Sequence, residues 1–233
     1  MSSPETPETS DHPPELPAHL RARILDALRS EPVPPRAEGA RRSALALALG
    51  FVTMTAILLA ISVPNLRGRP LAYVEVLVLV WTPVTIAATW AGVARGGSML
   101  GRSPRWLLAT AILTPLVLLL SWIPVTIDWP ETLVDSSETV HHLRCIAVTL
   151  GLSLGPFVAF AWVRRGSDPI SPWLTGAAIG TAAAAWGALM LPLICGFTSP
   201  VHMLIGHFLP IVLIAAIGAA LGGRLVAVRA RTE

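Results

Sequence analysis

Six stretches of this 233-residue sequence are almost wholly apolar, and each is near the length that a membrane-crossing helix requires. An α-helix needs about 20 residues to cross about 30 Å of hydrocarbon. The apolar residues are continuous and do not alternate with polar ones, which favours helices over the strands of a closed barrel. The sequence therefore predicts an all-α membrane protein, a bundle of six transmembrane helices within residues 43–226. The expected helices cover about 43–64, 71–94, 105–127, 143–163, 173–194 and 201–226.

The composition fits a membrane protein and argues against several other classes. Charged residues make up 13% of the chain, about half of the roughly 25% that is usual for soluble domains. No segment interleaves aromatic and basic residues, so we expect no direct nucleic-acid binding. The sequence also lacks a phosphate-binding loop, an HExxH motif and a serine-nucleophile motif. We therefore expect a protein that is not an enzyme.

The arginines are distributed unequally between the two sides of the expected bundle. Segments that flank the inner side of a membrane are enriched in basic residues, so the arginine-rich side is predicted to be cytoplasmic. Both termini lie on that side, including a short C-terminal tail at 227–233. The cytoplasmic side would hold Arg36, Arg41, Arg42, Arg95, Arg102, Arg105, Arg164, Arg165, Arg224, Arg229 and Arg231, and the outer side only Arg67, Arg69 and Arg144.

The N-terminal tail divides into two parts. Residues 1–15 are rich in proline and acidic residues and hold too few apolar groups to form a core, so they are expected to be disordered. Residues 16–31 repeat an apolar residue every four positions, which predicts a cytoplasmic amphipathic helix. Its basic face is weak for a helix that lies on lipid, so docking into an apolar groove of a partner protein is favoured. The candidate partner-binding residues are Leu16, Leu20, Ile24, Leu25 and Leu28.

Both cysteines and four of the six histidines fall at the outer ends of expected helices. Cys145 opens the fourth apolar stretch, with His141 and His142 one turn before it, and Cys195 closes the fifth. Thiolates and imidazoles bind copper, zinc and cadmium, and two thiols at one depth can instead form a disulfide. This layer predicts a signal-sensing site, with packing as the alternative role for each residue.

Two histidines at the start of the sixth stretch complete this layer. His202 and His207 are five residues apart, which is about 140° around an α-helix, so they do not simply share a face. One of them is therefore expected to be a ligand and the other a packing residue. The candidate metal ligands are Cys145, Cys195 and His202, and the metal would be a transient signal and not a resident cofactor.

Glu75 is the remaining candidate sensing residue, just inside the outer end of the second stretch. An ionisable group at that depth is a functional candidate by default. The alternative is an ion pair with Arg67 or Arg69, and the sequence leaves both readings open.

A set of small, basic, proline, cysteine and histidine residues marks the second half of the chain. It comprises Cys145, Arg164, Arg165, Gly166, Pro169, Pro172, Gly176, Gly180, Cys195, Thr198, Ser199, Pro200, His202, Gly206, His207, Pro210 and the GAALGGR segment that ends at Arg224. In these features the chain resembles the six-span anti-sigma factors typified by NrsF, and the myxobacterial CarR-type anti-sigma factors are similar in size and topology. The resemblance is carried over about 140–226, and over 16–130 only by topology and hydropathy. It implies a bacterial inner-membrane protein whose N-terminal segment binds an extracytoplasmic-function sigma factor, and whose two cysteines sense a metal or oxidant in the periplasm.

The alternative function is a small polytopic transporter or channel for metal ions. Such a protein needs polar or charged groups through the middle of its spans. The centres of the six stretches are mainly leucine, alanine, valine and isoleucine. The span centres therefore argue against a transporter, and the resemblance implies a membrane-bound anti-sigma factor that releases its sigma factor on a signal.

Overall fold

The structure is a computed structural model, in which the chain divides into two units, residues 1–40 and 41–233. It describes residues 17–30, 36–61, 75–94, 102–123, 138–167, 170–195, 197 and 199–227. The first unit contains the described helix α1 (Ala18–Ser30), inside the range predicted from the sequence for a partner-binding helix. Leu20 is exposed on this helix. Leu16, the side chains of Ile24, Leu25 and Leu28, the segment 1–15 and the tail beyond 227 lie outside the described residues, so their predicted roles stay predictions.

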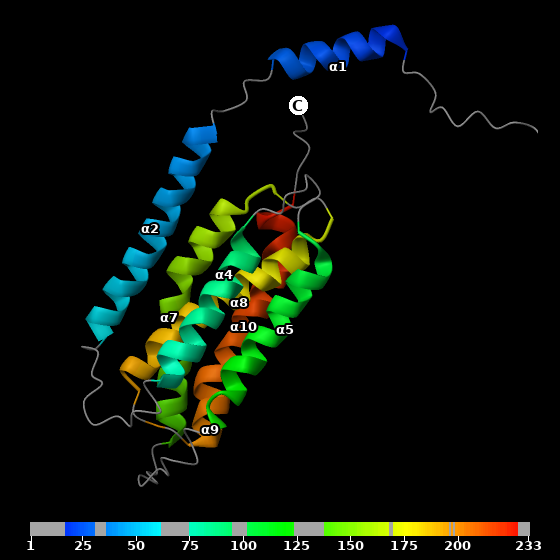
Figure 1. Cartoon of the computed structure of the whole chain (residues 1–233). Helices are drawn as coiled ribbons and strands as arrows, with labels where there is room; N and C mark the ends of the chain where they lie inside the picture. The colour runs from blue at the N-terminus through cyan, green and yellow to red at the C-terminus, as the bar shows by residue number, and fades with distance from the viewer. Residues whose placement is uncertain are drawn as a thin grey trace, which may run out of the picture. The chain divides into compact units, whose positions relative to one another are not determined.

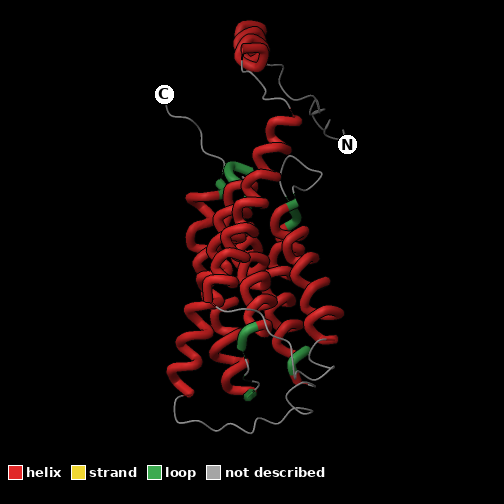
Figure 2. The backbone as a smooth tube through the Cα atoms, turned by 90° about the vertical axis from the view of Figure 1, so that its left-hand side faces the viewer, coloured by secondary structure: helices red, strands yellow, loops and turns green. Residues whose placement is uncertain are grey.

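The second unit is built from α-helices interrupted by short π and 3-10 turns (Figure 1). Two helices contain a π turn: η1 (Val76–Trp81) leads into α4 (Thr82–Val93), and α9 (Pro200–His202) passes through η3 (Met203–Phe208) into α10 (Leu209–Leu225). The other helices are α2 (Arg36–Ile61), whose first five residues belong to the first unit, α5 (Pro104–Leu120), α7 (Glu138–Val163) and α8 (Pro172–Met190), which ends in the 3-10 turn η2 (Leu191–Leu193). The tube view shows the helices of this unit running alongside one another (Figure 2).

Five of these helices are long and apolar enough to cross a membrane. They cover Ser43–Ile61, Val76–Val93, Val140–Val163, Pro172–Leu193 and Pro200–Leu225, at the positions of five of the predicted spans. The span expected at 105–127 is a shorter apolar helix, because α5 ends at Leu120 after 17 residues. The all-helical prediction is confirmed for the described residues, whereas the sixth span stays a prediction.

Hydrogen bonds of the Ser121 side chain explain why α5 ends at Leu120. The Ser121 hydroxyl donates to the Leu118 carbonyl and accepts from the Trp81 indole N–H, at 2.9 and 2.8 Å. A serine that bonds to a nearby carbonyl competes with the regular ladder of a helix. The backbone N–H of Trp122 turns to the Leu119 carbonyl, the tighter pattern of a final turn.

Helix α8 lies at the centre of the unit, in contact with α4, α5, α7 and α10 (Figure 1). It is made largely of alanine and glycine, and 89% of the residues in its apolar segment are buried. A Cβ atom added to Gly176 would collide with the Gly218 carbonyl oxygen of α10. Small residues let two helix backbones approach closely. The α8–α10 pair is therefore the tightest part of the bundle.

Helix α2 packs at the edge, against α7. A Cβ on Gly50 would lie 2.6 Å from the Ala159 side chain, so the two backbones meet at a glycine. Phe51 reaches past α7 to Trp186 of α8, with ring centroids 4.8 Å apart. Only 17% of the apolar segment of α2 is buried, so most of this helix faces outward.

Candidate functional site

The two cysteines lie in contact at one end of the bundle. Cys145 is the eighth residue of α7 and Cys195 lies two residues after the end of η2, and both are buried. Their sulfur atoms are 3.6 Å apart, and the Cys145 thiol donates a hydrogen bond to the Cys195 sulfur. Both are free cysteines. The fold thus joins two residues that are 50 positions apart in the sequence.

Two histidines complete a compact set of donor atoms. His202 Nε2 lies 3.3 Å from Cys195 Sγ. One donor atom from each of Cys145, Cys195, His202 and His207 lies within 4.8 Å of all the others, and all four residues are buried. We call these four residues the thiol–imidazole cluster.

A π turn explains why both histidines belong to the cluster. In η3 the hydrogen bonds join residues five apart, as from the Leu209 N–H to the Leu204 carbonyl. Residues five apart then lie nearly above one another, so His202 and His207 point the same way. The α-helical premise that the two histidines do not share a face therefore does not hold in this turn, and the metal-binding role of each stays a prediction. Pro210 contributes, because proline has no N–H to donate to the carbonyl four residues back, that of Gly206, and its ring crowds that carbonyl.

The same arrangement occurs in the second span. There Thr82 donates its N–H to the Leu77 carbonyl, five residues back, and Pro83 follows. In both helices the π hydrogen bond is therefore made by the residue directly before a proline. The prolines inside these apolar stretches are visible in the sequence, but they do not by themselves predict that a π turn will form.

Gly206 allows the turn to approach α7. A Cβ at this position would lie 3.2 Å from His202 Nε2 and 3.3 Å from the Cys145 Cβ, tighter than almost all real contacts. A larger residue would therefore push the histidine and the cysteine apart. On the other side, the Ser199 hydroxyl accepts a hydrogen bond from the His202 N–H at 3.2 Å and fixes the start of α9.

The two remaining predicted histidines lie beside the cluster. The His142 ring is buried, with its centroid 5.0 Å from that of His202. The His141 ring packs on Phe197, at 4.5 Å between centroids. His141, Phe197 and Arg144 also line a cavity of about 100 Å³ that reaches both cysteines. A cavity of this size admits water or a small ion to the thiols.

Glu75 is placed elsewhere. It is exposed at the start of η1 and does not belong to the group of donor atoms found among the described residues. Its proposed partners, Arg67 and Arg69, lie outside the described residues. The geometry of the described donor group does not support a sensing role for Glu75, which stays a prediction.

Hydrogen bonds favour a thiolate at Cys195, which lies beyond the apolar helix that ends at Leu193. The bond from the Cys145 thiol is the main cause that holds the pKa of Cys195 below the ordinary thiol value. The His202 ring adds to this effect, and burial opposes it. The thiolate is the form that binds metals and reacts with oxidants.

A row of hydroxyl groups runs from the cluster along α7. Thr149 donates to the Cys145 carbonyl at 2.9 Å, and Ser153 donates to the Thr149 carbonyl at 2.7 Å. Both side chains are buried, and a Cβ on Gly187 of α8 would collide with the Ser153 hydroxyl. Ser153, about two helical turns from Cys145, therefore lies against the backbone of α8 at Gly187.

Arg164 is a buried residue that was expected as a marker of topology and as part of the family resemblance, and not as a site residue. It follows the last residue of α7, at the opposite end from the cluster, and is 1% exposed. Its carbonyl accepts from the Ser167 hydroxyl, and the Ser167 N–H bonds to the Val226 carbonyl after α10. The adjacent arginine pair and Gly166, whose φ of 64° suits glycine, were the signals of a tight turn there.

Comparison with known proteins gives one match. The family model NrsF, described as negative regulator of sigma F, matches residues 27–227 of the chain. This range contains the whole thiol–imidazole cluster and most of the described helices. Neither the curated proteins nor the solved structures include a significant match to the chain.

Proposed function

Because the chain belongs to the NrsF family of negative regulators of sigma F, we propose that it is a membrane-bound anti-sigma factor with a sensor at the thiol–imidazole cluster. In this proposal it holds an extracytoplasmic-function sigma factor at the inner membrane. It releases that factor when a metal ion or an oxidant reaches Cys145 and Cys195 from the periplasm. The convergence of four buried donor atoms within 4.8 Å carries the proposal.

The cluster fits a tetrahedral soft-metal site. Two sulfur atoms, each about 2.3 Å from a tetrahedral zinc ion, lie about 3.8 Å apart, and a sulfur and an imidazole nitrogen lie about 3.6 Å apart. The corresponding distances here are 3.6 Å between the sulfurs and 3.3 Å from Cys195 Sγ to His202 Nε2. Small side-chain shifts would therefore suffice for binding.

His207 supports the same conclusion. Its ring is buried, and within the described part of the chain neither ring nitrogen makes a hydrogen bond of good geometry, although the ring lies close enough to Cys195 to interact with its sulfur. An unpaired polar atom costs about 1–3 kcal/mol when it is buried. A bound cation would offset that cost, which is a physical reason for a histidine at this position.

Oxidation is the second signal that the same atoms can receive. Two thiols in contact form a disulfide when an external oxidant removes two electrons and both protons leave. The sulfur atoms would have to approach from 3.6 Å to about 2.05 Å. Metal binding and oxidation would each draw α7 and the end of α8 together at this point.

The membrane location and orientation rest on the helices and the arginines. Five helices are long and apolar enough to cross a membrane, and α5 is apolar. The distribution of arginines supports cytoplasmic termini, and in that orientation Cys145 and Cys195 lie on the periplasmic side. An orientation of this kind separates the sensor from the sigma factor by the thickness of the membrane.

Helix α7 is the proposed connection between the two ends. It carries Cys145 near its start and Gly155, the contact point with α2, ten residues later. The chain before α2 includes the helix α1, the candidate segment that binds the sigma factor. A tenfold change in sigma-factor affinity needs only about 1.4 kcal/mol of coupling between the sites.

Metal binding by the purified full-length protein tests the sensor. We expect Co²⁺ to give thiolate charge-transfer and tetrahedral ligand-field absorption, and Zn²⁺ to displace it. Cys145→Ala, Cys195→Ala and His207→Ala should each weaken binding by more than about tenfold, whereas His141→Ala, outside the donor set, should not. Wild-type protein without this absorption would reject the metal signal, and metal uptake into proteoliposomes would favour the transporter alternative.

Docking of the sigma factor is tested in the full-length protein. Leu20→Asp with Ile24→Asp should abolish co-purification of the sigma factor and switch its target genes on without a signal, because charges cannot enter an apolar groove. Arg21→Gln with Arg23→Gln, on the same helix, is the matched control. Unchanged co-purification by the aspartate variant would contradict docking through this helix.

A further inference from the structure

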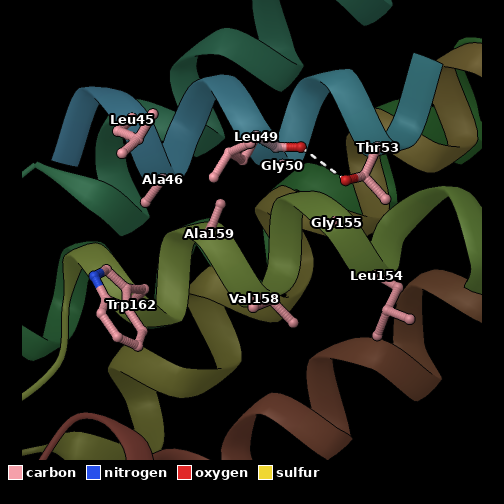
Figure 3. Close-up of a pocket in the computed structure, with 10 residues that line it drawn as sticks. All are labelled: Leu45, Ala46, Leu49, Gly50, Thr53, Leu154, Gly155, Val158, Ala159 and Trp162. Carbon is pink, nitrogen blue, oxygen red and sulfur yellow. Dashed lines mark hydrogen bonds between the residues drawn. The ribbon is translucent and has the colours of Figure 1, made fainter. Parts of the chain in front are cut away.

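An apolar groove of about 670 Å³ runs between α2 and α7 on the outward side of the bundle (Figure 3). Leu45 and Leu49 of α2 and Val158 and Trp162 of α7 form its walls. Gly50 and Gly155 belong to its lining at the point where the helices meet. The volume is in the range of about 300–1,000 Å³ that is usual for pockets that hold an organic ligand.

The lining offers almost no polar group to a ligand. The one hydroxyl in it, that of Thr53, already donates to the Leu49 carbonyl at 2.8 Å, as the dashed line in Figure 3 shows. A ligand in the groove would therefore be bound by apolar contact along its length. A hydrocarbon chain meets this requirement, whereas a polar metabolite does not.

One end of the groove has aromatic and basic residues beside it, whereas the rest of its lining is almost entirely apolar. Trp162 stands at this end near Leu45 (Figure 3), and the Arg165 guanidinium carbon lies 5.8 Å from the centre of its ring. Arg41 lies one helical turn before Leu45 and so extends the same row of α2. Arg41, Trp162 and Arg165 are all exposed. Tryptophan and arginine at the end of an apolar helix mark the level of the lipid headgroups.

We propose that this groove binds a phospholipid with an anionic headgroup. One acyl chain lies along the groove between α2 and α7, and the phosphate group lies between Arg41 and Arg165. Basic pockets between helices on the cytoplasmic side are a known way to bind anionic headgroups. The inference rests on the membrane location proposed above, but not on the sensor.

Charge argues against a second copy of the chain as the occupant. In a two-fold symmetric dimer whose axis is perpendicular to the membrane, the same surface of each copy meets the other. Arg41 and Arg165 of both copies would then meet at the same depth and repel. An anionic lipid neutralises these groups, so it is the occupant that the charges favour.

The test uses the full-length protein in phosphatidylcholine vesicles that contain a trace of photoactivatable lipid. The trace lipid is phosphatidylglycerol in one sample and phosphatidylcholine in the other, each with a diazirine on the acyl chain. We expect cross-links on the groove residues of α2 and α7, and stronger labelling by phosphatidylglycerol. One arginine near the surface is worth about 1 kcal/mol, or about fivefold, towards an anionic lipid.

Two variants separate the headgroup from the acyl chain. Arg41→Gln with Arg165→Gln should remove the preference for phosphatidylglycerol, whereas Arg105→Gln, an exposed arginine at the start of α5, should leave it unchanged. Ala46→Phe should fill the groove and lower labelling by both lipids. Ile112→Phe, on the exposed face of α5, is the matched control.

Three results would overturn the proposal. They are equal labelling by the two lipids, labelling spread evenly over the exposed faces of α5 and α10, and cross-linked dimers joined through the groove residues. Absence of labelling on every helix would reject the membrane location as well. Loss of groove labelling alone would reject only the lipid site.

Discussion

Helices α8 and α2 are both long and apolar, yet they have opposite places in the bundle. In α8, 89% of the residues in the apolar segment are buried, against 17% in α2. The difference follows from side-chain size, since α8 presents alanine and glycine to its neighbours whereas α2 presents leucine and valine outward. Small residues allow contact on all sides of a helix. In these two helices hydropathy predicts the span, whereas the size of the side chains decides whether the span is central or peripheral.

This contrast assigns different mechanical roles to the two helices. The centre of the bundle cannot move without separating α8 from four neighbours at once. Helix α2 is attached along one seam, with Gly50 against Gly155 and Phe51 against Trp186. Helix α2 is also the span that follows the candidate docking helix. A signal that shifts α7 can therefore change the position of α2 while the centre stays folded.

The largest expected effect is a substitution in the centre. Gly176→Leu should destabilise the protein by more than about 3 kcal/mol, since the new side chain collides with the backbone of α10 and overpacking cannot be relieved there. Thermal unfolding in detergent, followed by a thiol-reactive dye that reports the two buried cysteines, measures the loss. Gly223→Leu is the control, because no heavy atom lies within 4 Å of a Cβ at that position. Equal destabilisation by both variants would contradict the central role of α8.

The second-largest expected effect is a substitution at the edge of the bundle, where α2 contacts α7. Gly155→Leu should separate α2 from α7 and cost about 1–3 kcal/mol, less than the change at Gly176 because the rest of the bundle keeps its contacts. Gly151→Leu is the control one turn earlier on α7, where an added Cβ meets nothing within 4 Å. A reporter of the sigma factor should respond to Gly155→Leu and not to Gly151→Leu. If the reporter stays silent, α2 does not transmit the signal.

The smallest expected effect is a substitution in an aromatic contact between α2 and α8. Trp186 packs edge to face against Phe51 and donates its indole N–H to the Thr89 hydroxyl at 2.8 Å. Trp186→Phe keeps a ring but loses the hydrogen bond, which should cost about 1 kcal/mol. Trp106→Phe, at a tryptophan that is 66% exposed, should cost much less when unfolding is measured in the same way. A larger cost at Trp106 would mean that exposed aromatic groups, and not this contact, stabilise the bundle.

Much of the helical architecture could be predicted from the sequence because hydropathy is a property of single residues summed over a window. Five of the expected spans are present as long apolar helices, while the stretch at 105–127 gives a shorter one. Its end at Leu120 depends on Ser121, whose hydroxyl bonds to Leu118 and Trp81. Trp81 is 40 residues away, so no window of the sequence contains both partners.

The candidate site could be predicted only as a layer. Residue positions near helix ends placed the cysteines and histidines at one depth, and the fold brings four of them together. The presence of both His202 and His207 in the cluster could not be predicted. An α-helix with 3.6 residues per turn would separate them by about 140°, and η3 departs from that period. Glu75 shares the layer but not the cluster, since depth does not determine which side of a helix faces inward.

The π turn at Met203–Phe208 would also lengthen its helix if it changed to α-helical geometry. A π turn holds about one residue more than an α turn, which corresponds to about 1.5 Å of helix rise if the turn relaxes. Relaxation would rotate His207 away from His202 and lengthen α10 towards the far face. A metal ion bound by both imidazoles would hold this turn in its π form, because relaxation would separate the two rings.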